Sequence, residues 1–380
     1  MNFETQINAH RPGGHSGIGA SNAARWMNCA GSVALVAKCP PLAPSKYAQE
    51  GTIAHRVAEI LLRGHVEPFE LWGLNGVTFE MLIGAIDYET CILSEILKSG
   101  GTLEIEKQIH MPSIDIDARG TADAVVLNPG ELHIIDYKYG AGVGVEVENN
   151  PQLLYYALGA FLSYPLNIVA KIKKINTWIV QPRAIHPAGP VRCAMYSPEE
   201  LVDFGNKLIA AIAKTKQADA PLCVGAWCRF CPALAVCPLQ GKITLASAQN
   251  DFRKDGPPPH PATLSPKDIA HVLENKILIE AWLSSVYAWA LAHMQSGLSV
   301  PGFKLVEGRS ARMWTDEKKA AEFLGSAAFV TKLISPAQAE KIVKNLPENL
   351  VTRRASGPVI DVADSKKEAY VNFLNIKETQ

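Results

Sequence analysis

The sequence lacks several features that would assign it to a class at once. No apolar run reaches 18 residues, and residues 1–20 are polar and glycine-rich, without the apolar centre of a secretory signal. The chain also has no excess of charge of either sign, because 37 Lys and Arg residues balance 37 Asp and Glu residues. We therefore expect a cytoplasmic protein that contacts no membrane. Any surface that binds phosphate groups has to be local, since the chain has no excess positive charge.

The composition is that of a globular protein with several parts. The chain has 380 residues, and its hydrophobic share of 48% is ample for a buried core. Residues 251–262 read DFRKDGPPPHPA, which predicts a stiff linker that continues neither helix nor strand. We expect one domain over residues 1–245, a linker over 246–262, and an α+β, mainly helical C-terminal domain over 263–380.

A strong hairpin signal lies in the first of these domains. Two runs rich in β-forming residues, 121–127 and 132–139, flank the sequence Asn-Pro-Gly-Glu at 128–131. Pro-Gly at the two central positions is typical of a tight turn. The sequence therefore predicts a β-hairpin here, preceded by a strand over 102–110.

Three charged residues are expected to converge at the open end of this hairpin. If Asn128 faces Glu131 across the turn, the same register places Asp123 opposite Asp136. Lys138 joins the two carboxylates, because residues two apart along a strand share a face. Two anions this close repel each other unless a cation lies between them, and a hard divalent ion with oxygen ligands is the usual solution. The pattern predicts a Mg²⁺ or Mn²⁺ site, with an exposed hairpin bearing ordinary surface charges as the alternative.

A helix is predicted to follow the hairpin. Pro151 suits the first helical position, and Asn149 or Asn150 suits the capping position before it. Gln152 and Tyr156 are four residues apart and therefore share one face of this helix. They either approach the carboxylates or are an ordinary first-turn polar residue and a core aromatic residue.

Four short motifs occur along the chain in a recognisable order: E-G-T-x-x-H from Glu50 to His55, G-x-x-D from Gly120 to Asp123, D-Y-K from Asp136 to Lys138, and Q-x-x-x-Y from Gln152 to Tyr156. Together they resemble the PD-(D/E)XK nuclease superfamily, in particular its RecB-like exonuclease branch. Ala122 stands where the superfamily name has Pro, at a position that carries no chemistry. The resemblance implies an α/β fold with a restriction-endonuclease-like core, a mixed central β-sheet flanked by helices. The expected order of helix, β-meander, helix, strand and helix agrees with that core.

The resemblance also implies a role for each motif residue. The implied ligands of one or two Mg²⁺ or Mn²⁺ ions are His55, Asp123, Asp136 and the backbone carbonyl of Tyr137. Lys138 would orient the attacking water or stabilise charge on the phosphate. Gln152 and Tyr156 would position the substrate backbone or brace the metal site. Without the resemblance, His55 reads as an ordinary residue on a helix predicted over 48–63.

The eight cysteines are unevenly spread, and four of them crowd into one segment: Cys223, Cys228, Cys231 and Cys237. In a reducing compartment such a segment indicates a metal site, and a local four-cysteine zinc site is one interpretation. In the iron-sulfur branch of the RecB-like nucleases, three cysteines after the Q-x-x-x-Y helix join one cysteine upstream of the first motif. This layout implies a structural [4Fe-4S] cluster on Cys29, Cys228, Cys231 and Cys237. Whether Cys29 or Cys223 is the fourth ligand stays open.

The expected function is that of a metal-dependent DNA exonuclease. The part after the linker resembles a phage and prophage family related to these exonucleases, which implies DNA recombination, replication or repair in the cytoplasm of a host cell. No G-x-x-x-x-G-K-[ST] loop is present, so a helicase would have to supply unwinding, and a single-strand-binding or annealing protein is a further expected partner. The alternatives are a catalytically inactive nucleic-acid-binding scaffold held by zinc or an iron-sulfur cluster, and a redox or regulatory iron-sulfur protein.

Overall fold

The computed structural model of the protein describes residues 16–39, 46–64, 66–141, 143–243, 263, 265–295, 297 and 300–303. The predicted linker over 246–262 and the predicted C-terminal domain beyond residue 303 lie outside these residues. The contacts of the chain separate Met1–Lys318 from Lys319–Gln380 as two units. This division differs from the one expected from composition, because it groups the long helix after residue 265 with the first unit.

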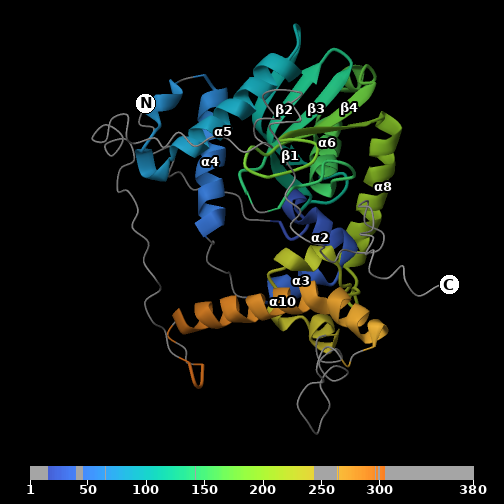
Figure 1. Ribbon diagram of the computed structural model, residues 1–380. Helices are drawn as coiled ribbons and strands as arrows, with labels where there is room; N and C mark the ends of the chain where they lie inside the picture. Colours follow the sequence, from blue (N-terminus) through green and yellow to red (C-terminus); the bar gives the residue numbers. More distant parts are fainter. Residues whose placement is uncertain are drawn as a thin grey trace, which may run out of the picture. The chain divides into compact units, whose positions relative to one another are not determined.

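One sheet of five strands forms the centre of the first unit (Figure 1). Neighbouring strands follow the chain order: β1 (Thr102–His110), β2 (Arg119–Asn128), β3 (Glu131–Tyr137), β4 (Lys174–Val180) and β5 (Val191–Tyr196). The pairing of β3 with β4 is parallel and the other three pairings are antiparallel. The predicted α/β fold with a mixed sheet flanked by helices is therefore confirmed, whereas β5 was not predicted.

Helices cover both faces of the sheet. The longer ones are α4 (Lys46–Leu62), α5 (Phe79–Thr90), α6 (Pro151–Ser163) and α8 (Pro198–Thr215). The shorter ones are α2 (Ala23–Asn28), α3 (Ser32–Ala37), α7 (Leu166–Val169), η1 (Ala20–Asn22), η2 (Pro68–Glu70), η3 (Leu74–Gly76), the π-helical η4 (Cys91–Ile96), η5 (Ala226–Phe230) and η6 (Leu234–Val236). A further long helix, α10 (Pro266–Gln295), packs against the short helices η5 and η6 and, in its described residues, not against the sheet. Figure 1 shows α4 and α5 on one side of the sheet and α6 and α8 on the other. None of the described helices is long and apolar enough to cross a membrane.

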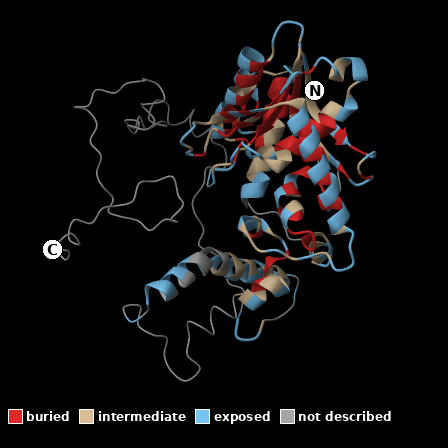
Figure 2. Ribbon diagram, turned by 90° about the vertical axis from the view of Figure 1, so that its right-hand side faces the viewer, coloured by how far each residue is buried: buried red, intermediate tan, exposed pale blue. Residues whose placement is uncertain are grey.

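The alternation of side chains along the strands divides the interior into two cores. Val125 and Ile134 face α6 and α8, while Val126 and Ile135 face α4 and α5. Because successive side chains point to opposite faces of a strand, both faces of the central strands are apolar and buried. Figure 2 shows the buried residues gathered in the sheet and on the helix sides that face it.

The central hairpin has the predicted two-residue turn. Asn128 pairs with Glu131, and Gly130 has a φ of 80°, which a residue without Cβ adopts at little cost. The pairing runs outward to Ala124 opposite Ile135. One further step in the same register reaches Asp123 and Asp136, as the turn length predicts.

The start of α6 is fixed by its cap. Pro151 occupies the first turn, and the side chain of Asn150 accepts hydrogen bonds from the backbone N–H groups of Gln152 (3.0 Å) and Leu153 (3.4 Å). These bonds satisfy two donors that a helix start leaves without intrahelical partners. Gln152 is therefore held in the first turn of α6, at the end that follows the hairpin.

Candidate active site

The predicted site residues come from four elements that meet at the C-terminal end of β3. His55 lies on α4, Asp123 on β2, and Asp136 near the end of β3, with Lys138 directly after it. Gln152 and Tyr156 lie on the first turns of α6: the structure brings both into the same group as Lys138 and the carboxylates.

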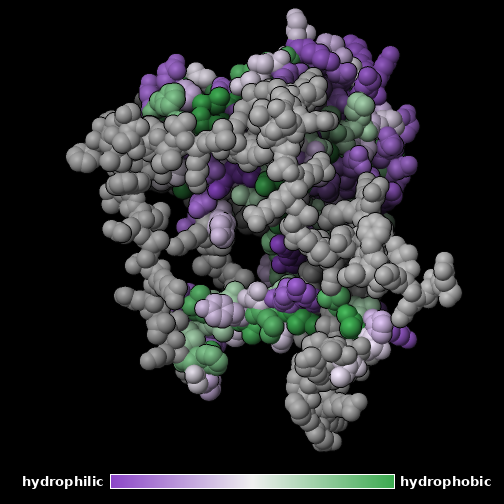
Figure 3. Space-filling view, in the orientation of Figure 1, coloured by the Kyte–Doolittle hydropathy of each residue, from purple (hydrophilic) through white to green (hydrophobic). Residues whose placement is uncertain are grey.

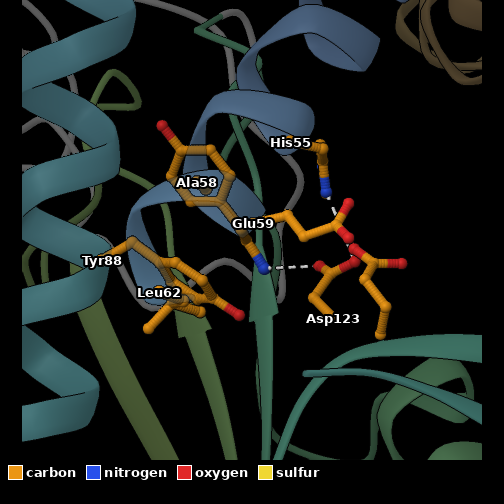
Figure 4. A pocket seen from close by; sticks show the side chains of 8 residues that line it. His55, Ala58, Glu59, Leu62, Tyr88 and Asp123 are labelled. Carbon is orange, nitrogen blue, oxygen red and sulfur yellow. Dashed lines mark hydrogen bonds and ion pairs between the residues drawn. The ribbon is translucent and has the colours of Figure 1, made fainter. Parts of the chain in front are cut away.

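The Asp123 carboxylate links α4 to the hairpin. Its Oδ1 lies 3.3 Å from Nδ1 of His55, and its Oδ2 accepts the backbone N–H of Tyr137 at 2.9 Å (Figure 4). The ring of Tyr137 meets the His55 ring edge-on, with 5.4 Å between centroids. Tyr137 thus contacts Asp123 through its backbone N–H and His55 through its ring. This role is separate from the metal ligation that was expected of its backbone carbonyl.

Lys138 links the hairpin to α6. Its Nζ lies 3.0 Å from Oδ2 of Asp136 and donates a hydrogen bond of 3.0 Å to Oε1 of Gln152. Gln152 in turn neighbours the buried side chain of Tyr156, four residues later on α6. The close packing explains Gly120 in the G-x-x-D motif, because a Cβ there would lie 3.0 Å from Cε1 of Tyr156.

Burial and neighbouring charges separate the two carboxylates electrostatically. Burial raises the pKa of Asp136, and the nearby Asp123 raises it further, against the opposing effect of Lys138. Burial also acts to raise the pKa of Asp123, but His55, the Tyr137 N–H and Lys138 outweigh it, so that this pKa is lowered. The pKa of His55 and that of Lys138 are raised: burial acts to lower both, and the carboxylates prevail. The charged form of Asp136 is therefore the least well compensated charge of the four.

A small cavity opens beside the His55–Asp123 contact and contains two acidic residues that the sequence analysis missed. About 180 Å³ of empty space, open solvent included, is lined by His55, Ala58, Glu59, Leu62, Tyr88, Glu106, Asp123 and Tyr137. Figure 4 shows the Glu59 side chain directed toward Asp123. Glu59 is four residues after His55 on α4, a spacing that places both on one helix face. Arg63 pairs with Glu59 at 3.0 Å, and Arg56 pairs with it as well.

Glu106 reaches the cavity through an irregularity in β1. The pairing of β1 with β2 joins Ile105 to Ala124 and Lys107 to Ala122, which leaves Glu106 opposite Asp123. Glu106 has a φ of 53°, an uncommon conformation for a residue with a Cβ. The pairs on both sides of Glu106 keep one register, so no residue is inserted, and the positive φ alone redirects the side chain. The sequence carries no signal for it because no Gly marks the position.

The cysteine segment lies beside the upstream cysteine. The Cys29 sulfur accepts the backbone N–H of Cys223 at 3.3 Å, although the two residues are 194 positions apart. Burial raises the pKa of the Cys228 thiol, and the nearby sulfurs of Cys231, Cys29 and Cys237 add to that rise. The four cysteines that the resemblance implies as ligands are therefore neighbours. Cys223 makes its contact with Cys29 through its backbone N–H and is itself exposed.

A comparison with protein-family models matches residues 15–368 to a family described as a protein of unknown function, DUF2800. The chain belongs to the DUF2800 family. The match covers the helix that bears His55, the hairpin, α6 and the cysteine segment, so all the predicted site residues of this DUF2800 protein lie inside the family's extent.

The donor types at the hairpin end suit a hard divalent cation. Asp123 and Asp136 offer carboxylate oxygens and His55 offers an imidazole nitrogen, a set that Mg²⁺ and Mn²⁺ accept. In the part of this DUF2800 chain that the structure describes, no three His, Cys, Asp or Glu side chains are already spaced to hold a metal ion. A bound cation would compensate the charge of Asp136, which is the group whose ionised form the surroundings disfavour most.

Proposed function

We propose that this protein is a metal-dependent deoxyribonuclease that hydrolyses phosphodiester bonds at the end of the central hairpin. The observation that carries the proposal is the chain of contacts from His55 to Asp123 and from Asp136 through Lys138 to Gln152. Two carboxylates, an imidazole, a buried ammonium group and an amide are functional groups that can serve metal-assisted phosphodiester hydrolysis.

Each residue has a task in this proposal. Asp123, Asp136 and His55 would hold Mg²⁺ or Mn²⁺, which supplies polarisation of the phosphate and a more acidic water. Lys138, held between Asp136 and Gln152, would place its ammonium group beside the phosphate oxygen on which negative charge develops. Gln152 would keep the Lys138 side chain extended toward the substrate, because without it Nζ loses its partner on α6. Tyr156, which neighbours Gln152 and both carboxylates, would brace the site.

A matched pair of lysine variants tests the proposal. Lys138 and Lys98 both pair with a carboxylate of β3, but Lys98 meets Glu131 at the turn end of the hairpin, at 2.7 Å. We expect Mn²⁺- or Mg²⁺-dependent cleavage of end-labelled DNA by the wild type, a loss of about 10²- to 10³-fold in kcat for Lys138→Ala, and little change for Lys98→Ala. Intact DNA with every metal and substrate tried, or equal cleavage by both variants, would overturn the assignment and leave the inactive scaffold.

The substrate ends distinguish an exonuclease from an endonuclease. We propose an exonuclease, so linear single- and double-stranded DNA should be degraded while covalently closed circles of the same sequence stay intact. Labels placed at the 5′ or the 3′ end of the linear DNA then report the polarity of digestion. Opening of closed circles at a comparable rate would replace the exonuclease by an endonuclease.

We further propose that Cys29, Cys228, Cys231 and Cys237 hold a structural [4Fe-4S] cluster. Anaerobically purified protein should be brown and contain about four iron atoms per chain. Cys29→Ser should lose the colour and the iron, whereas Cys223→Ser and the exposed control Cys193→Ser should keep both. A colourless protein that contains zinc would establish the zinc alternative.

A further inference from the structure

Among the described residues of helix α10, six exposed side chains form a regular line. Its members follow one another at intervals of 4, 3, 4, 3 and 4 residues: Ile269, Leu273, Lys276, Glu280, Leu283 and Tyr287. This spacing is the a and d pattern of a heptad, which keeps one seam on one side of a helix. We call these six residues the α10 seam.

The α10 seam is open to solvent along its whole length. The exposed fraction is 39% for Ile269, 37% for Leu273, 54% for Leu283 and 72% for Tyr287. Other parts of α10 pack against η5 and η6 of the cysteine segment. Figure 3 shows hydrophobic side chains along α10, with a hydrophilic group partway along the helix. An exposed apolar line on an otherwise supported helix marks an interaction surface.

The α10 seam reads the same from both ends. Two apolar residues are followed by two charged ones and then by two apolar ones, so its midpoint falls at position 278. In an antiparallel pair of helices an a position of one helix faces a d position of the other. A second copy of α10 running the opposite way would therefore place Ile269 against Tyr287 of the partner subunit, and Leu273 against Leu283 of the partner subunit.

The two charged residues at the centre of the α10 seam favour a second copy of α10 as the partner, in antiparallel orientation. The same antiparallel register places Lys276 against the partner's Glu280, and twofold symmetry repeats that pair. A parallel pair would instead bring Lys276 against Lys276 of the partner subunit, which is repulsive. Within one chain Lys276 Nζ lies 3.9 Å from Glu280 Oε1, and both side chains are well exposed, at 59% and 64%. Both are therefore accessible to a partner of opposite charge.

We propose that α10 is a homodimerisation helix, which pairs in an antiparallel manner with α10 of a second copy of this chain. A C2 interface requires one surface that is complementary to itself. The α10 seam meets this requirement, because its apolar residues face apolar residues of the second copy and its two charged residues face opposite charges. The helix is already supported by η5 and η6, so pairing does not have to meet the cost of forming it. From Ile269 to Tyr287 the seam extends about 27 Å at 1.5 Å per residue, a usable length for a coiled-coil contact.

A charge swap tests the inference without reference to catalysis. The full-length protein is examined by sedimentation equilibrium over a range of concentrations, with circular dichroism to verify folding. We expect a dimer for the wild type and a dissociation constant raised at least about tenfold by Lys276→Glu or by Glu280→Lys, because each creates two like-charge pairs. The double variant restores opposite charges at both places, and its dissociation constant should return to within about threefold of the wild-type value.

An off-seam control and an apolar change complete the experiment. Lys267→Glu makes the same charge change at an exposed position of α10 outside the seam, and the dimer should persist. Leu273→Gln should weaken the dimer at unchanged charge. A wild type that stays monomeric, a dimer indifferent to Lys276→Glu, or a double variant as weak as the single ones would each overturn the antiparallel pairing.

Discussion

Two helical glycines, Gly159 on α6 and Gly51 on α4, are expected to respond in opposite ways to replacement by alanine. In a helix interior Ala is favoured over Gly by about 1 kcal/mol, so helix propensity alone predicts stabilisation at both positions. The space around them differs, however. A Cβ at Gly51 meets no atom within 4 Å, whereas a Cβ at Gly159 would lie 2.1 Å from Cγ2 of Ile109.

The clash at Gly159 cannot be relieved by a rotation of a flexible side-chain end. Ile109 is 2% exposed on β1, and its β-branched side chain has few alternative rotamers. Apolar carbons prefer about 3.5 to 4 Å, so α6 and β1 have to separate by more than 1 Å. Overpacking of this kind costs about 1 to 3 kcal/mol. After subtraction of the propensity gain, Gly159→Ala is expected to destabilise the protein by up to about 2 kcal/mol, while Gly51→Ala stabilises it by up to about 1 kcal/mol.

Urea denaturation followed by circular dichroism measures both variants against the wild type. At an unchanged slope, the midpoint should fall for Gly159→Ala and rise for Gly51→Ala. A Gly159→Ala protein at least as stable as the wild type would refute the reasoning, because it would mean that α6 and β1 do not approach as closely as the structure shows. Equal shifts for both variants would show that helix propensity alone decides the result.

Three further changes have expected outcomes. Asp136→Asn should leave the metal-free protein at least as stable as the wild type, because burial disfavours the charged form of the Asp136 carboxylate. In differential scanning fluorimetry, Mn²⁺ should raise the melting temperature of the wild type but not that of the variant, and equal increases would contradict the metal site. The hydrogen bond from Lys216 is the main cause that lowers the pKa of Asp115, so the carboxylate stabilises the fold above about pH 4 and ceases to do so as the pH falls through its folded pKa. Asp115→Asn should thus cost about 1 kcal/mol in urea titrations at pH 7 and progressively less below pH 4, and a constant cost would refute the ionic contribution. Gly120→Ala should displace Tyr156 and lower kcat for DNA cleavage by about tenfold in a folded protein, and unchanged cleavage would show that this contact positions nothing.

Local signals made much of the fold predictable. Pro129-Gly130 fixed the turn, and Asn150 with Pro151 fixed the start of α6, because each acts through bonds to residues a few positions away. Strand β5 escaped prediction because its six residues are only partly buried and acquire their regular structure by pairing with β4. The π-helical turn at Cys91–Ile96 carries no sequence signal either, because Ile92, Ile96 and Leu97 continue the apolar spacing of an ordinary helix through it.

The candidate site was predictable to the extent that it depends on strand register. Counting from the turn was enough to bring Asp123 and Asp136 to the same end of the hairpin, one residue beyond the pair of Ala124 and Ile135. His55 needed the resemblance, because its contact with Asp123 joins residues 68 positions apart and no spacing rule connects them. Glu106 lay beyond both approaches, since it enters the cavity through a positive φ at a residue that rarely adopts one.

The charges at the hairpin end give a physical reason for the site to bind a cation. Asp136 keeps a raised pKa although Lys138 lies 3.0 Å away, so its ionised form opposes folding at any pH above that pKa. His55 has a raised pKa as well, so its stabilising effect is present below its unfolded pKa and is lost as the pH rises through the folded value. When His55 loses its proton, Asp123 and Asp136 lose the positive charge of the imidazolium that compensated theirs. At the same pH the neutral imidazole becomes able to bind a metal ion. Loss of the proton and gain of a divalent cation therefore compensate each other, and cation affinity at this site should increase as the pH passes upward through the pKa of His55.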